Sequence, residues 1–183
     1  MIKKLSAISL MLVSTFASAE YTYPAISVNL HYTQPITESS AENHPVADSV
    51  QEYVSVYANI YGSGMHSHQY IKATPESPYK SFTLDSGAEI HNTINTEIVQ
   101  GATFYSNETV VQNKRTSQAK FYVHRIDGNS EVGLDCNGNL SHVRIVATDE
   151  HGTEQSIQCS GQTSNIYLTM ENVRDIDIYP TVQ

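Results

Sequence analysis

The sequence of 183 residues has no tryptophan, two cysteines and ten lysine and arginine residues against 19 acidic residues, which gives a formal net charge of −9. The acidic balance argues against nucleic acid or an anionic membrane as a partner, because binding to either depends on basic patches. The cysteines do not form a C-x-x-C motif, so they do not indicate a zinc site. No motif in the sequence indicates a particular family.

Residues 1–19 have the pattern of a secretory signal peptide. Two lysines near the start precede an apolar run over residues 5–16, and Ala17-Ser18-Ala19 fits the small-x-small rule of a cleavage site. The apolar run is shorter than the roughly 20 residues that a membrane-spanning helix needs. We therefore expect cleavage after Ala19, a secreted or periplasmic protein and no transmembrane segment.

Residues 20–183 have the length of a single domain and contain no internal repeat. The only loose stretch, residues 33–48, is interpreted as a long loop within that domain. In an oxidising compartment the isolated pair Cys136 and Cys159 predicts one disulfide near the C-terminus. Its loop of about 24 residues is expected to stabilise the fold by roughly 3 kcal/mol.

Apolar residues alternate with polar ones in several short segments of the mature chain, as in half-buried strands. These segments are residues 26–30, 54–60, 121–123, 143–147, 166–170 and 176–178. Glycine and asparagine turns separate many of them. The pattern predicts an all-β protein with an antiparallel β-sandwich of Ig-like or jelly-roll-like type. Residues 88–99 fit both a helical stripe and alternation, and their threonine and asparagine content favours a strand.

A register argument applies to the strands 143–148 and 153–159. A three-residue loop over residues 150–152 pairs Val143 with Cys159 and keeps the apolar residues on one face. A loop one residue longer or shorter would place Arg144 on that face. The pattern therefore selects the three-residue loop.

The dipeptide Asn137-Gly138 looks like a tight hairpin, and this interpretation conflicts with the disulfide. A flat three-stranded meander would place Cys136 and Cys159 on its two outer strands, roughly 10 Å apart. A disulfide needs Cα atoms within about 7 Å. We therefore predict that the connection through Asn137-Gly138 crosses from one sheet to the other, which favours a two-layer sandwich.

Tyrosine is the unusual component, with twelve residues against four phenylalanines. Tyr53, Tyr57 and Tyr61 recur on one side of the strand 54–60, whose other side is aliphatic. Tyrosine offers a broad apolar ring with a polar tip, which suits recognition surfaces. We expect these three residues to form a binding surface, unless a second layer covers them. The absence of tryptophan counts against a platform for stacking sugars.

Met65, His66 and His68 form the best metal-like cluster, because thioether and imidazole groups together suit copper. The cluster follows Gly62-Ser63-Gly64, so we expect it on a loop. The sequence supplies no obvious third and fourth ligand. Exposed loop histidines are the competing interpretation.

The motifs of hydrolases and of calcium loops are absent from the sequence, and it indicates no cofactor. We therefore predict a non-enzymatic β-sandwich that binds a protein or a cell-surface receptor, as an adhesin, surface-assembly component or inhibitor. Two alternatives remain open, a secreted pore-forming cytolysin and a periplasmic metal carrier. The sequence also leaves oligomerisation open.

The signal-peptide hypothesis has a direct test. The intact mass of the exported protein should lack residues 1–19, because signal peptidase cleaves after the small-x-small site. Recovery of the full-length chain outside the cytoplasm would show that the hypothesis is wrong.

Overall fold

The computed structural model describes residues 21–33, 47–62, 64–87, 93–138, 140, 142–161 and 164–180. The regular structure of these residues is β-strand throughout, and they include no helix long and apolar enough to span a membrane. The expected signal peptide, and most of the expected loop at residues 33–48, lie outside the described residues.

Two sheets make up the fold. The five-stranded sheet has the order β4 (Tyr79–Leu84), β1 (Ile26–His31), β11 (Val173–Tyr179), β8 (Arg144–Asp149) and β9 (Glu154–Gln158). The six-stranded sheet has the order β10 (Asn165–Glu171), β7 (Asn129–Asp135), β6 (Thr109–Ile126), β5 (Thr93–Ser106), β2 (Ser49–Gly62) and β3 (Met65–Ala73). All neighbouring strands are antiparallel except β1 and β11, which pair in parallel.

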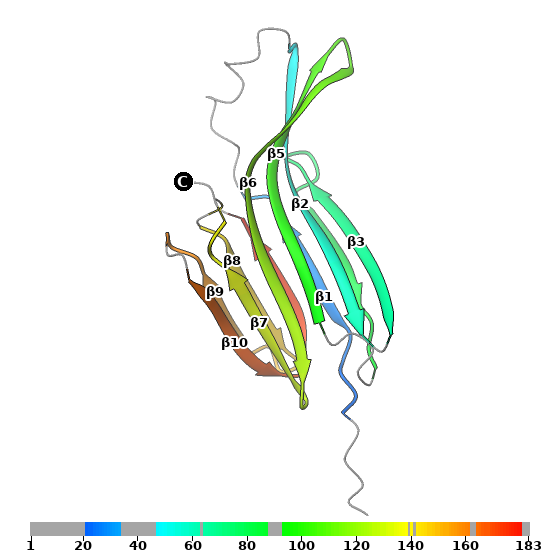
Figure 1. Ribbon diagram of the computed structural model, residues 1–183, viewed down its shortest axis with the longest axis vertical. Coiled ribbons are helices and arrows are strands. Elements are labelled where there is room, and N and C mark those ends of the chain that lie inside the picture. Colours follow the sequence, from blue (N-terminus) through cyan, green and yellow to red (C-terminus); the bar gives the residue numbers. More distant parts are fainter. Residues whose placement is uncertain are drawn as a thin grey trace, which may run out of the picture.

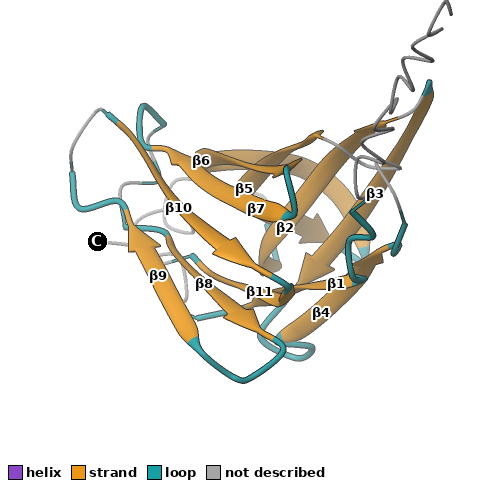
Figure 2. Ribbon diagram, turned by 90° about the horizontal axis from the view of Figure 1, so that it is seen from below, coloured by secondary structure: helices purple, strands orange, loops and turns teal. Residues whose placement is uncertain are grey.

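The sheets lie face to face as two layers, so the predicted β-sandwich is confirmed (Figure 2). Alternate residues of the strands point between the layers and form one continuous apolar core. Val56 of β2, Ile98 of β5 and Ile176 of β11 are fully buried there. The layers approach each other along both sides, where β9 contacts β10 and β3 contacts β4. The outer face of each sheet points to solvent.

The ambiguous segment at residues 88–99 is a strand where the structure describes it. Residues 93–99 belong to β5, with Ile94 and Ile98 in the core and Asn95 and Glu97 on the outer face. The strand interpretation is therefore confirmed for these residues, while residues 88–92 lie outside the described part.

The register predicted for the C-terminal hairpin is confirmed. Ile145 pairs with Ile157, and the Cys159 N–H donates a hydrogen bond to the Val143 carbonyl at 3.0 Å. The turn residue Gly152 has φ of 80°, a left-handed value that glycine adopts without a steric penalty.

The sheet-to-sheet crossing at Asn137-Gly138 is confirmed as well. β7 belongs to the six-stranded sheet and β8 to the five-stranded one, so the connection between them passes from one layer to the other. This brings Cys136 and Cys159 to a Cα–Cα distance of 5.6 Å, and they form the disulfide. The bond therefore links the two layers.

A long arm formed by β5, β6 and the start of β2 projects beyond the sandwich (Figure 1). Its tip is the turn at Asn107 and Glu108, both with positive φ. A small second core of Ala102 and Phe104 packs with Ala47 and Val50 inside the arm. The arm was not predicted from the sequence.

The disulfide generates a prediction about stability. Thiol labelling of the denatured, non-reduced protein should find no free cysteine. Reduction removes a cross-link worth roughly 3 kcal/mol, so it should lower the melting temperature by roughly 6–12 °C in a chain of this size. Two reactive thiols in freshly purified protein would contradict the prediction.

Candidate functional site

The three tyrosines of β2 lie on the outer face of the six-stranded sheet. Val54, Val56, Ala58 and Ile60 occupy the alternate positions and are buried in the core. Tyr57 and Tyr61 are 40% and 41% exposed, and Tyr53 is half-buried. No second layer of the described chain covers Tyr57 or Tyr61, so these rings are open to contact from solvent.

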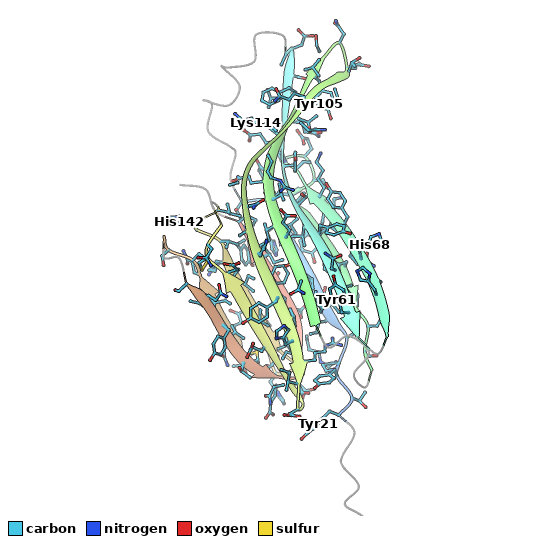
Figure 3. All side chains as sticks on the ribbon, viewed as in Figure 1. Tyr21, Tyr61, His68, Tyr105, Lys114 and His142 are labelled. Carbon is cyan, nitrogen blue, oxygen red and sulfur yellow. A yellow bond between two sulfur atoms is a disulfide. The ribbon has the colours of Figure 1, made fainter. Side chains whose placement is uncertain are left out.

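The neighbouring strand β3 adds three more rings to this surface. In the register of β2 and β3, Tyr61 lies opposite His66, and Tyr57 lies opposite the exposed Tyr70. The His66 ring stacks on Tyr61 at a centroid distance of 4.7 Å, and the His68 ring stacks on Tyr57 at 5.9 Å. Figure 3 shows Tyr61 and His68 on these adjacent strands. We call the set Tyr53, Tyr57, Tyr61, His66, His68 and Tyr70 the tyrosine face.

The loop predicted for Met65, His66 and His68 is wrong, because these residues begin β3. Gly64, with φ of 78°, reverses the chain so that pairing with β2 starts at once. β3 is an edge strand whose residues from His66 to Tyr70 are all exposed. It therefore shows no apolar alternation from which a strand could have been recognised.

The metal-carrier hypothesis is neither supported nor overturned by this geometry. His66 and His68 share one face of β3, as residues two apart on a strand do. Among the described residues, no three His, Cys, Asp or Glu side chains gather closely enough to hold a metal ion. The Met65 side chain lies outside the description.

A groove of about 520 Å³ lies on the same outer face, next to the tyrosine face. The groove runs across β2, β5, β6, β7 and β10 between the rings of Tyr57 and Tyr122. Its lining consists of Tyr57, Asn59, Asn95, Thr96, Glu97, Lys120, Phe121, Tyr122, Asp135 and Asn165. Its size falls within the range of about 300–1,000 Å³ that is typical of small-molecule pockets.

Strand register explains how residues distant in the sequence meet in this groove. One row of cross-strand neighbours runs Tyr57, Glu97, Lys120, Asp135 and Asn165, from β2 to β10. The adjacent row runs Asn59, Asn95 and Tyr122. Neighbouring rows on one face are two residues apart along each strand, so their side chains line a common surface.

Gly133 of β7 has no side chain, and the Tyr122 ring occupies the space that one would fill. Gly133 lies opposite Tyr122, and a Cβ atom at this position would clash with the Tyr122 Cζ atom. The ring therefore lies over the backbone of β7, away from the short side chain of Asn95. Burial, and then the negative charge of Glu131 with its hydrogen bond from the hydroxyl, raise the pKa of Tyr122. The phenol stays neutral and anchored.

Charged side chains of both signs alternate along the groove. Glu97 accepts a hydrogen bond from Arg115 at 2.9 Å, and Asp135 accepts one from the Asn137 side chain at 2.6 Å. Lys120 lies between these two carboxylates in the cross-strand row. The structure gives the amides of Asn59, Asn95 and Asn165 no side-chain hydrogen bond within the described residues. These amides are therefore available to a ligand.

The outer face of the other sheet carries a second cluster that the sequence did not reveal. The His31 Nε2 atom lies 2.6 Å from Asp177 Oδ1, and the His31 ring stacks on Tyr179 at 4.5 Å. Tyr79 contacts the same imidazole at 5.3 Å, edge-on. Only the parallel pairing of β1 with β11 brings His31 and Asp177 together, and no local pattern signals such a pairing.

Comparisons of the chain with protein-family models, with curated proteins and with solved structures found no match. The tyrosine face and the adjacent groove are therefore the features from which we infer the function.

The exposure of the tyrosine face predicts the stability of its variants. Tyr57→Ala should lower the free energy of unfolding by no more than about 0.5–1 kcal/mol, as at ordinary surface positions. The core variant Ile98→Ala serves as a control and should lower it by about 2–5 kcal/mol. Urea denaturation of the two variants checks this. A loss of 3–5 kcal/mol for Tyr57→Ala would instead place the ring in a packed core.

Proposed function

We propose that the protein is a non-enzymatic, secreted or periplasmic β-sandwich that binds a protein or cell-surface partner through the tyrosine face. It would act as an adhesin, a surface-assembly component or an inhibitor. The observation that carries the proposal is the exposure of Tyr57 and Tyr61 on a strand whose opposite side already fills the core.

The rigidity of the tyrosine face supports this proposal. Its rings stand on two paired strands, and the stacking of Tyr57 with His68 and of Tyr61 with His66 restrains them before any partner arrives. Lys72 lies 4.3 Å from the Tyr53 ring centroid and restrains that ring in the same way. Aromatic side chains fixed in advance lose little conformational entropy on binding, and they often form the energetic centre of an interface.

The distribution of charge also favours a binding role for this face. The outward residues of β2 and β3 include no carboxylate, although the whole chain carries 19 acidic residues. A partner approaching these strands therefore meets aromatic and neutral polar groups, together with the Lys72 ammonium beside Tyr53. Depletion of charge at the centre of a patch, with aromatic enrichment, is characteristic of interface cores.

The disulfide supports the proposed location. A bond linking the two layers persists where the environment is oxidising, as outside the cell or in a periplasm. This agrees with the signal-peptide hypothesis for residues 1–19.

Attachment of the labelled protein to cells of the producing organism and to erythrocytes tests the proposal. Tyr57→Ala and Tyr61→Ala should each weaken attachment by more than about 1 kcal/mol, which is roughly fivefold, because truncation removes an anchoring ring. Tyr21→Ala is the matched control, since Tyr21 is 53% exposed and belongs neither to the tyrosine face nor to the cluster around His31. Equal attachment of all three variants would overturn the proposal. Lysis of the erythrocytes would favour the cytolysin hypothesis instead.

A further inference from the structure

The groove between Tyr57 and Tyr122 has a chemistry of its own. Its floor lies on β5 and β6, the two central strands of the six-stranded sheet. The groove combines two flat aromatic rings with three side-chain amides, two carboxylates and one ammonium group.

The position of the groove indicates how a ligand would be recognised. In the middle of a sheet, backbone N–H and C=O groups are already used in the ladder on both sides of each strand. An extended peptide obtains its affinity from backbone hydrogen bonds at a sheet edge, and the central strands offer none. The specificity of the groove must come from side chains alone.

Sugars meet these conditions. A sugar ring presents a face of C–H groups that packs on an aromatic ring, and an edge of hydroxyls that are both donors and acceptors. Amides offer both a donor and an acceptor, and carboxylates accept two hydroxyls at once. Tyr57 and Tyr122 supply the flat rings for which tryptophan is often used. The side chains of Asn59, Asn95 and Asn165 line the same groove.

The charged side chains in and around the groove favour uncharged sugars over acidic ones. Glu97 pairs with Arg115 at 2.9 Å, and Asp135 lies opposite Lys120 in the cross-strand row, so each cation here already faces a carboxylate. The chain as a whole carries a formal charge of −9. A sialylated, sulfated or uronic-acid sugar would approach an acidic chain and meet cations that already face carboxylates, whereas an uncharged sugar would need only hydrogen-bonding groups.

We propose that this groove binds an uncharged oligosaccharide. Tyr57 and Tyr122 pack against the faces of its rings, and Asn59 and Asn95 hydrogen-bond its hydroxyls. The inference rests on the proposed binding role of the outer face and names the chemical class of the partner. Tyr57 belongs both to the tyrosine face and to the wall of the groove.

A panel of immobilised oligosaccharides tests the inference. The uncharged members are built from galactose, glucose, mannose and N-acetylhexosamines, and the acidic members are sialylated or sulfated. The wild-type protein should bind a subset of the uncharged members. No saturable binding up to millimolar concentration, or a preference for the acidic members, would overturn the inference.

Variants and spectroscopy locate the binding. Asn95→Ala should weaken it by roughly three- to tenfold, and Tyr57→Ala by about tenfold or more. Asn113→Ala is the matched control, because Asn113 is an exposed asparagine on the arm. In NMR titrations the side-chain amide signals of Asn59, Asn95 and Asn165 should shift. Unchanged affinity in both groove variants would overturn the inference.

Cell attachment separates this inference from the proposed function. Periodate cleaves the vicinal diols of surface sugars, so attachment that needs Tyr57 should be lost on periodate-treated cells. Attachment that needs Tyr57 but survives the treatment would overturn the oligosaccharide inference and leave the proposed function intact. Tyr57-independent attachment, together with sugar binding in solution, would overturn the proposed function alone.

Discussion

The strict alternation of side chains across a strand is the constraint on which the rest of the structure depends. In β2 the positions from Val54 to Ile60 that point inward fill the core, so the tyrosines between them must point outward. The same constraint in β5 and β6 directs Asn95 and Lys120 to the outer face while Ile98 and Phe121 fill the interior. The same alternation therefore puts the core on the inner face of these strands and the candidate site on their outer face.

The elements that the sequence predicted correctly are those in which alternation is strong. The aliphatic half of β2, the register of Val143 with Cys159 and the crossing at Asn137-Gly138 all followed from period-two patterns combined with distances that a disulfide allows. The outward direction of the three tyrosines followed from the same reasoning, and what they bind stays a prediction.

The remaining features depend on which strands are neighbours and in what register they pair, and no local sequence pattern contains this. β3 is an edge strand and is exposed from His66 to Tyr70. Its sequence therefore does not alternate between apolar and polar residues there. The groove requires the register of five strands at once, which puts Tyr57 of β2 and Asn165 of β10 in one cross-strand row with three strands between them. A single strand gives no sign of such a juxtaposition. Gly133 shows its importance only beside the Tyr122 ring that covers it.

The parallel pair of β1 and β11 has a consequence for how the molecule assembles. β11 joins β1 to β8, so without it the five-stranded sheet falls into two separate pairs, β4 with β1 and β8 with β9. Contacts between segments so far apart in the chain form slowly, because a long loop must close first. We expect this sheet to close only after residues 173–179 have emerged during synthesis. Until then the edge of β1 that pairs with β11 has no strand partner.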